Sequence, residues 1–319
     1  MVAALVPSGT DQHGRLGAMK VLCAVDGSEF SLWGVEALRS LIVQRPDPVI
    51  LLHVADTRSL KARGRKDRET VQASLAAVMR EGEQLLHHVD QVACLALSHA
   101  PTRSRSKVRA VMVQGPVPET VVRQANRRRV DLLILGSRGL SDDRTFPLGS
   151  VARSVVSLSS RPVLVVKRPL GELTRVVLAI DGSKHARVAA DFLRRAVLPM
   201  PAHLSIISVV PPVVTDLAAR VLPRAQLEAL AKPEAERARQ LLGHMRETFL
   251  KEGCAVMTEV VSGPPSQAIL AYADKHHADL VVVGSRGSAK KHRFPLGSVS
   301  ERVIKYAPCA VLVVRTARA

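Results

Sequence analysis

Two glycine-rich segments of this 319-residue chain carry the residue types and spacing best suited to chemistry. The first, GSRGLSDDRTFPLGSV, begins at Gly136, and the second, GSRGSAKKHRFPLGSV, begins 148 residues later at Gly284. Both follow the pattern G-x2-G-x9-G-S directly after a short apolar run. Glycine lets a backbone come close to a ligand, and the free N–H groups at the start of a helix attract anions. The repeated pattern therefore favours a phosphate-binding loop over a tight turn that holds no ligand.

This pattern differs from two better-known nucleotide motifs. It lacks the GK[ST] of a Walker A loop, so no lysine is placed for a γ-phosphate, and it is not the Rossmann G-x-G-x-x-G. The serine after the last glycine could cap the following helix or donate its hydroxyl to a phosphate oxygen. The candidate residues of the pattern are Gly136, Gly139, Gly149 and Ser150 in the first copy and Gly284, Gly287, Gly297 and Ser298 in the second.

A second pair of motifs follows the first apolar run of each copy: Asp26-Gly27-Ser28 and Asp181-Gly182-Ser183. Each aspartate would stand at the carboxyl end of a strand, where it could accept hydrogen bonds from ribose hydroxyls or a base amino group. The aspartate or the serine could equally cap the following helix. The sequence leaves both interpretations open, and one residue could serve both.

The two glycine loops differ in charge between their shared ends. The first contains Asp142, Asp143 and Arg144, whereas the second contains Lys290, Lys291, His292 and Arg293. A carboxylate repels a polyphosphate unless a cation bridges the two. We therefore expect the second copy to bind the more anionic ligand more tightly when no divalent metal is present.

These motifs belong to a long internal repeat. KVLCAVDGSEFS, from Lys20, is matched by RVVLAIDGSKHA, from Arg175, and each copy closes on an apolar run led by proline. A period of about 150 residues indicates two tandem domains rather than a solenoid. We expect a flexible tail over 1–18, a first domain over 19–168, a linker over 169–174 and a second domain over 175–319.

Each copy alternates short apolar runs with helical patterns, such as those over Ser31–Val43, Thr70–Val89, Glu119–Arg128 and Ser150–Ser157. The expected strands are Val21–Val25, Val49–Val54, Val108–Val113, Leu132–Leu135 and Val163–Val166, then Val176–Ile180, Leu204–Val209, Ala255–Val260, Leu280–Val283 and Ala310–Val314. Runs of Val, Ile and Leu with little alternation are typical of strands buried on both faces of a parallel sheet. The fold class is therefore α/β, with two tandem doubly wound domains whose ligands bind at the carboxyl ends of the strands.

A net charge of +18 raises a competing class, a protein that binds nucleic acid electrostatically. The basic clusters that would serve it are Arg58, Lys61, Arg63, Arg65, Lys66 and Arg68, and then Arg103, Arg105, Lys107 and Arg109. Against this class, only 3% of the residues are aromatic, which leaves few platforms for stacking bases. The sequence also contains no helix-turn-helix, RRM or zinc-finger pattern.

The four cysteines, Cys23, Cys94, Cys254 and Cys309, form no CxxC pair. We expect buried, reduced thiols, and neither a metal site nor a disulfide framework is predicted. The sequence shows no signal peptide and no apolar run long enough to cross a membrane, so a cytoplasmic protein is expected.

With these motifs in view, the chain resembles the universal stress protein family in its tandem, ATP-binding form. The two glycine loops, the VDGS and IDGS segments and the LLHVAD stretch carry the resemblance, which covers about 300 of the 319 residues. It implies five parallel strands flanked by helices in each domain, a Rossmann-like fold similar to the adenine nucleotide alpha hydrolases. It also implies binding of ATP or another adenine nucleotide, which Mg²⁺ could accompany.

The resemblance implies particular site residues as well. The adenine pocket falls on Asp26 and the backbone of Val54, the phosphate and ribose contacts fall on the glycine loop with Arg138, and the Gly115 turn lines the same crevice. The matching residues of the second copy are Asp181, Val209, Gly263 and Arg286 with the second glycine loop. The position of Val209 leaves a shift of one residue open, because ISVVPP departs from the usual HV pattern. The two arginines could pair with phosphate or remain solvated.

In the family the last strand often pairs subunits edge to edge. Val163–Val166 and Ala310–Val314 are therefore expected to pair within the chain, because an unpaired Val-rich edge strand is prone to aggregate. A homodimer is a further option that the sequence does not decide. No residues are placed for catalysis, so we expect a nucleotide-dependent stress sensor or regulator rather than an enzyme, although slow ATP hydrolysis is compatible with the sequence.

Overall fold

The computed structural model describes residues 19–41, 46–58, 68–98, 107–140, 142, 147–197, 202–212, 223–251, 253–287 and 295–315. The chain divides into two compact units. Unit 1 is built mainly from the chain up to Glu172, and unit 2 mainly from the chain from Leu173 onward. The expected N-terminal tail, residues 1–18, lies outside the described residues.

Unit 1 contains five strands in the order β3-β2-β1-β4-β5, and each neighbouring pair is parallel. The strands are β1 (Met19–Ala24), β2 (Pro46–Ala55), β3 (Val108–Gln114), β4 (Leu132–Gly136) and β5 (Val163–Val166). The helices are α1 (Glu29–Glu36), α2 (Leu38–Leu41), α4 (Arg68–Ser98), α5 (Val117–Arg127) and α6 (Ser150–Leu158). Helix α4 begins close to the expected Thr70 but ends nine residues beyond the expected Val89.

Unit 2 repeats this arrangement, with five strands in the order β10-β9-β6-β7-β8 and parallel neighbours throughout. The strands are β6 (Arg175–Ala179), β7 (His203–Val210), β8 (Ala255–Ser262), β9 (Leu280–Gly284) and β10 (Ala310–Val314). The helices are α7 (Lys184–Phe192), which continues into a π-helical turn over Leu193–Val197, α9 (Arg224–Leu250), α10 (Pro265–Lys275) and α11 (Ser298–Tyr306).

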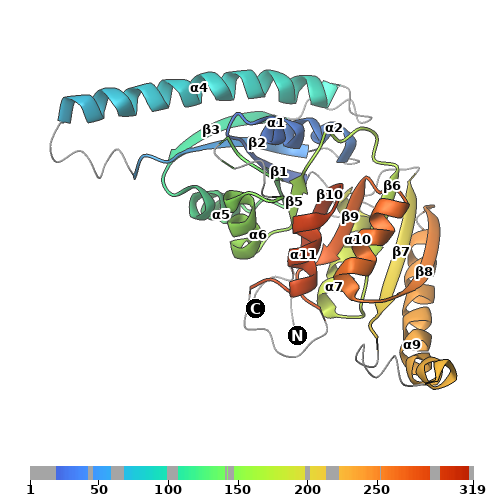
Figure 1. Cartoon of the computed structure of the whole chain (residues 1–319). Coiled ribbons are helices and arrows are strands. Elements are labelled where there is room, and N and C mark those ends of the chain that lie inside the picture. Colours follow the sequence, from blue (N-terminus) through green and yellow to red (C-terminus); the bar gives the residue numbers. More distant parts are fainter. Residues whose placement is uncertain are drawn as a thin grey trace. The chain divides into compact units, whose positions relative to one another are not determined.

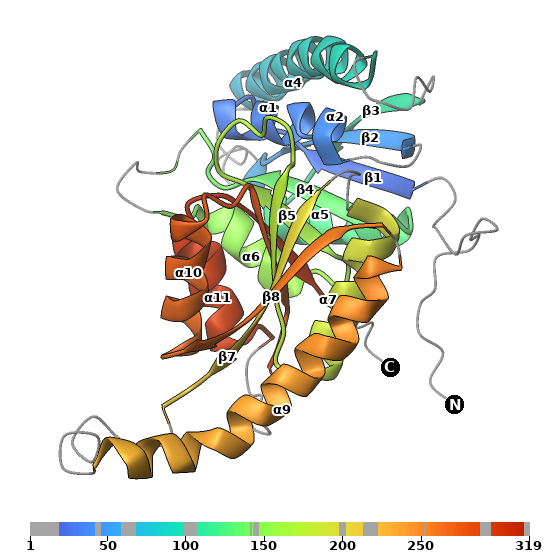
Figure 2. The same ribbon diagram turned by 90° about the vertical axis from the view of Figure 1, so that its right-hand side faces the viewer.

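Helices cover both faces of the strands in each unit. Figure 1 shows α4 on one side of the strands of unit 1 and α5 and α6 on the other. Figure 2 shows α10 and α11 on one side of β7 and β8, with α9 on the opposite side. The inner strands are buried accordingly: β4 and β9 are buried at every residue except the last. The predicted α/β class is thus confirmed. The expectation of strands buried on both faces holds for the inner strands but is wrong for β3 and β8, which contain no buried residue.

The strand order reverses between β1 and β4 in unit 1 and between β6 and β9 in unit 2. A crossover helix leaves the sheet in opposite directions on the two sides of such a point, and a crevice opens at the carboxyl ends of the strands. The two Asp-Gly-Ser motifs and the two glycine loops follow these four strands directly. The topology therefore brings both predicted motifs of a unit to the same edge of its sheet.

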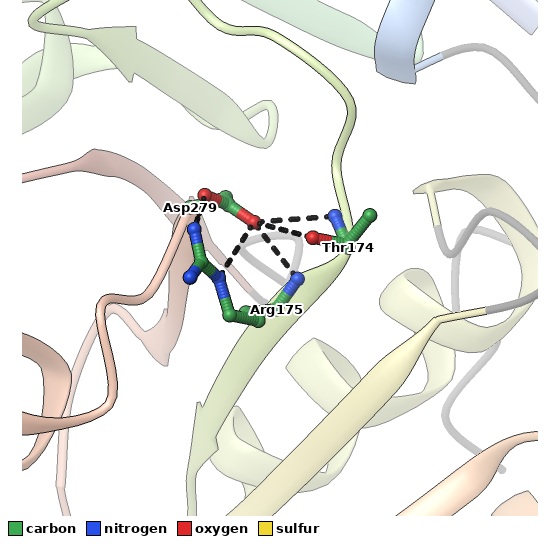
Figure 3. Close-up of polar contacts among 3 residues, drawn as sticks. All are labelled: Thr174, Arg175 and Asp279. Atoms are coloured by element: carbon green, nitrogen blue, oxygen red, sulfur yellow. Dashed lines mark hydrogen bonds and ion pairs between the residues drawn. The ribbon is translucent and has the colours of Figure 1, made fainter.

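A partly buried carboxylate links two strands at the opposite edge of unit 2, where the strands begin. Asp279, just before β9, accepts hydrogen bonds from Thr174 N at 3.2 Å, Thr174 Oγ1 at 3.1 Å and Arg175 N at 2.9 Å, and pairs with Arg175 Nη2 at 3.0 Å (Figure 3). Burial alone would raise the pKa of Asp279, but the hydrogen bonds from Arg175 and Thr174 outweigh it and hold the pKa below its ordinary value. The contact ties the start of β6 to the start of β9.

Asp131 is the matching residue of unit 1, and its carboxylate has fewer hydrogen-bond donors. It accepts a hydrogen bond from Lys20 N at 2.8 Å, which joins the starts of β1 and β4. Burial raises the pKa of Asp131, because it outweighs the stabilisation of the charged form by Lys20 and Arg161.

The cysteines are free, as expected, but the prediction that all four are buried is wrong for one of them. Cys23, Cys254 and Cys309 are buried, whereas Cys94 is exposed on α4. The residue type favours burial, but the face of a long helix that meets the sheet is fixed by packing.

Candidate functional site

The turn after the first strand of each unit has the same construction. Asp26 Oδ1 accepts a hydrogen bond from Ser28 N at 3.0 Å, and Asp181 Oδ1 accepts one from Ser183 N at 3.0 Å. The intervening Gly27 has a φ of +86°, a conformation that L side chains rarely adopt. Ser28 caps α1 by accepting from Ser31 N.

The serine, and not the aspartate, therefore caps the helix in both units, since Ser183 likewise caps α7 by accepting from Ala186 N. In unit 1 the second oxygen of the aspartate, Asp26 Oδ2, accepts from Leu140 N of the glycine loop at 3.2 Å. Asp26 thus connects the first turn to the glycine loop. A ligand bound between the turn and the loop would contact Asp26.

Val54 lies on β2, beyond the stretch of that strand that pairs with β1. Val25 N donates to Leu52 O at 2.9 Å, and Val54 is two residues further along the same strand edge. Because alternate residues of a strand present their peptide groups to the same neighbour, the main chain of Val54 faces past the end of β1.

The same register fixes the matching residue in unit 2. Ile180 N donates to Ile207 O at 2.9 Å, so Val209 stands where Val54 stands in unit 1. The ISVVPP stretch of the second copy departs from the HVAD of the first. The register of β7 on β6 nevertheless matches that of β2 on β1, without a shift of one residue.

Gly115 and Gly263 lie directly after the third strand of each unit, at the same edge of the sheet. Gly115 N donates to Ala55 O and Gly263 N donates to Val210 O, both at 3.1 Å. Their φ values are +148° and +134°, so each turn requires glycine. The turns hold the carboxyl ends of the second and third strands together in both units.

Each glycine loop is anchored at both ends by main-chain hydrogen bonds. In unit 1 Ser137 N donates to Val166 O and Gly149 N donates to Ser137 O, both at 2.8 Å. In unit 2 Ser285 N donates to Val314 O at 2.9 Å and Gly297 N to Ser285 O at 2.8 Å. The last glycine therefore precedes the helix in both units as its N-cap, and Ser150 and Ser298 are the first helical residues.

The first glycine of each loop has a packing reason of its own. A Cβ added to Gly136 would lie 2.6 Å from Phe30 C, and one added to Gly284 would lie 2.7 Å from His185 C. Both contacts are with helix backbone, which cannot move aside. These two glycines are needed for the first helix to pack on the fourth strand, and a ligand is not required to explain them.

The second glycine of each loop faces the aspartate. A Cβ on Gly139 would lie 2.6 Å from Asp26 Oδ2, and one on Gly287 would lie 2.9 Å from Asp181 Oδ2. A side chain at either position would therefore have to displace the carboxylate, and this contact places the two predicted motifs side by side in both units.

In unit 1 the loop amides hold a carboxylate from the loop itself. Asp142 Oδ2 accepts a hydrogen bond from Gly139 N at 2.7 Å, and Asp142 Oδ1 accepts a longer one from Ser150 N at 3.3 Å. The side chain also touches the position where Gly149 would carry a Cβ. The amino end of α6 therefore binds an anionic group that belongs to the chain.

The sequence signalled this residue only in part. The charge difference between the loops marked Asp142 as a residue that would repel phosphate, but not as one that is bound by the loop. In unit 2 the matching residue is Lys290, which lies outside the described residues. The atoms nearest to a Cβ on Gly297 are main-chain atoms of Ser285, Arg286 and Gly287, at 3.3 Å or more.

Arg138 lies with its guanidinium 5.5 Å from the centre of the Phe30 ring, a cation–π contact. The side chain is thus placed against α1 in this structure. The matching residue for Phe30 in unit 2 is His185, whose Nδ1 lies 3.1 Å from Ser285 Oγ. The aromatic ring that Arg138 packs against is therefore replaced by histidine in the sequence of unit 2.

The basic clusters that motivated a nucleic-acid interface fall mostly outside the described residues. Of the first, Arg58 is described and pairs with Asp56 at 2.6 Å, and Arg68 begins α4. Of the second, Lys107 and Arg109 are described and exposed. Within the part of the chain that the structure covers, no helix combines the length and apolar character needed to cross a bilayer.

Comparisons with known proteins relate both halves of the chain to one family. The model of the universal stress protein family matches residues 18–167 and again residues 172–315. The universal stress protein MJ0577 of Methanocaldococcus jannaschii is 31% identical over 153 residues, which are 47% of this chain and 94% of that protein. A second relative from that organism, MJ0531, is 40% identical over 89 residues, 28% of this chain but only 51% of the relative.

A crystal structure covers both units together. The universal stress protein from Archaeoglobus fulgidus aligns over 93% of this chain and 98% of its own, with 25% identity and a TM-score of 0.64. Because the family model matches each half of the sequence and each half has the same doubly wound unit, this chain belongs to the universal stress protein family, with two family domains in tandem.

Proposed function

We propose that each unit binds an adenine nucleotide at the carboxyl edge of its sheet and that the protein acts as a nucleotide-dependent regulator in a stress response. The base and ribose would lie between the aspartate and the main chain at the end of the second strand, Asp26 with Val54 in unit 1 and Asp181 with Val209 in unit 2. The phosphates would lie against the amides of the glycine loop and the start of the following helix.

The observation that carries this proposal is the carboxylate of Asp142 on the amides of Gly139 and Ser150. Carboxylate and phosphate oxygens are the same class of acceptor, and main-chain amides at a helix start bind both. The loop of unit 1 is therefore already shaped to hold an anion. The matching anchoring bonds in unit 2 support the same geometry there.

A regulatory role rests on what the nucleotide would connect. The ligand would bridge three chain segments that are remote in sequence: the turn after the first strand, the end of the second strand and the glycine loop. Any form of the protein in which these segments are correctly placed would be favoured by binding. A change in nucleotide supply could then alter the surface offered to a partner, with no chemical step by the protein.

Mass spectrometry of the small molecules released from purified, heat-denatured protein tests the proposal directly. We expect an adenine nucleotide from the unaltered chain and none from Gly149→Val combined with Gly297→Val. Gly149 and Gly297 have φ values of −68° and −75°, which valine can adopt. The new side chain would crowd Asp142 in unit 1 and the main chain of Arg286 in unit 2, and so would fill the space in front of the helix.

Gly243→Val is the matched control, because Gly243 is an exposed residue of α9 with no atom within 4 Å of an added Cβ. It should retain the nucleotide at the level of the unaltered chain. Retention at that level by the double loop variant, with circular dichroism showing intact folding, would refute the site.

A further inference from the structure

We propose that Asp142 is an internal competitor for the phosphate groups, so that unit 1 discriminates among adenine ligands by their negative charge. This inference rests on the proposed function and adds a specificity-determining residue to it. The basis is that two of the amides expected to bind phosphate, Gly139 N and Ser150 N, donate to the carboxylate of Asp142.

Binding of a phosphate to these amides requires the carboxylate to leave. The two acceptors cannot share Gly139 N, whose hydrogen bond to Asp142 Oδ2 is 2.7 Å long. The main chain of Asp142 is itself tied back to the loop, because Asp142 N lies 3.3 Å from Gly139 O in a tight turn. Even a displaced carboxylate therefore stays close to the bound phosphate and repels it.

Asp26 adds to the same effect. Its Oδ2 accepts from Leu140 N, the residue after Gly139, so two carboxylates flank one short segment of the loop. A ligand that carries several charges meets more repulsion than one that carries few, whereas a ligand without phosphate meets none. The loop of unit 2 has Lys290 at the position of Asp142, so its sequence provides a cation there in place of the competitor.

The test uses the full chain with Gly297→Val, which removes the site of unit 2 from the titration. Calorimetry without divalent metal compares adenosine, AMP and ATP binding to this parent, to the parent with Asp142→Asn and to the parent with Asp143→Asn. Asparagine keeps the shape of Asp142 and removes its charge, and Asp143→Asn removes the same charge from the next residue.

We expect Asp142→Asn to strengthen ATP binding by about ten- to a hundred-fold, the range expected for losing a competing charged hydrogen bond. AMP binding should gain less and adenosine binding should not change. Asp143→Asn should give a clearly smaller gain for ATP. An ATP affinity equal to that of the parent in Asp142→Asn, with adenosine still binding, would overturn the role of Asp142 while leaving the nucleotide site in place.

Failure of the proposed function would look different, since adenosine, AMP and ATP would then bind neither the parent nor the unaltered chain. A mirror variant keeps the inference testable if Asp142→Asn does not fold. In the full chain with Gly149→Val, Lys290→Asp should weaken ATP binding by unit 2 about ten-fold or more, with adenosine binding unchanged. Unchanged ATP binding in that variant would count against the inference.

Discussion

The glycine loops of the two units share their framework and differ in what lies inside it. Gly149 N and Gly297 N each donate to a serine carbonyl at 2.8 Å, and each loop begins with a glycine that packs against the backbone of the first helix too closely for a side chain. Inside this frame, unit 1 holds the carboxylate of Asp142, whereas unit 2 has Lys290 in the matching place.

This contrast separates two kinds of constraint. The frame follows from close backbone approaches, which leave no choice of residue. The charge inside the loop is carried by side chains that the frame does not require, so the two copies could diverge there without loss of fold. Two sites of the same geometry can therefore differ in the ligand that they prefer.

The largest effect is expected at the first glycine of each loop, where the two units pack in the same way. Gly136→Val and Gly284→Val should each destabilise their own unit by about 3 kcal/mol or more, because the new side chain meets helix backbone. Hydrogen exchange in urea, read by mass spectrometry on peptides of each unit, measures both losses in the full chain. A loss in one unit and not in the other would contradict the shared framework.

The second prediction concerns the carboxylates at the amino ends of the strands. Asp279→Ala should destabilise unit 2 by about 1–3 kcal/mol, because it leaves the amides of Thr174 and Arg175 without their acceptor. Asp131→Ala should lower the free energy of unfolding of unit 1 by a smaller amount, because burial of Asp131 disfavours its charged form. Chemical denaturation of both variants checks this order, with Asp274→Ala, an exposed residue of α10, as the control for charge removal.

The same pair should respond to pH with opposite sign. The pKa of Asp279 is lower in the folded protein than its ordinary value of about 3.9, so its contribution is present above that value and is lost as the pH falls through the folded pKa. The pKa of Asp131 is raised, so its contribution is full below about pH 3.9 and is lost as the pH rises through the folded pKa.

Free energies of unfolding for Asp279→Asn and Asp131→Asn, each subtracted from the unaltered chain over this acid range, report the two slopes. Stability differences that change with pH in the same direction would refute the contrast between the two carboxylates.

The smallest effect concerns the reactivity of the cysteine thiols. One thiol of the native protein, Cys94 on α4 of unit 1, should react with a maleimide, while Cys23, Cys254 and Cys309 should react only after unfolding. Partial burial of the sulfur and the nearby Asp90 raise the pKa of Cys94, so its labelling should accelerate most at alkaline pH. Peptide mapping identifies the label, and Cys94→Ser should abolish native labelling.

Much of the fold could be predicted because it depends on local pattern. The buried strands were indicated by unbroken runs of Val, Ile and Leu, and the observed β3 and β9 differ from the expected runs by a single residue at one end. The Asp-Gly-Ser turns and the glycine loops were likewise indicated by residue type. The exposure of Cys94 was missed, because the buried face of α4 depends on how the helix lies against the sheet.

The sequence by itself determined the repeat, the strand–helix alternation and the positions of the Asp-Gly-Ser turns and the glycine loops. Only the tertiary structure decided that Val209 stands in register with Val54, that Gly136 packs against α1 and that Asp142 lies on the amides of its own loop. The reason is physical: periodicity and turn preference act between neighbours in the chain, whereas hydrogen bonds and close packing are set by distances between segments that the fold brings together.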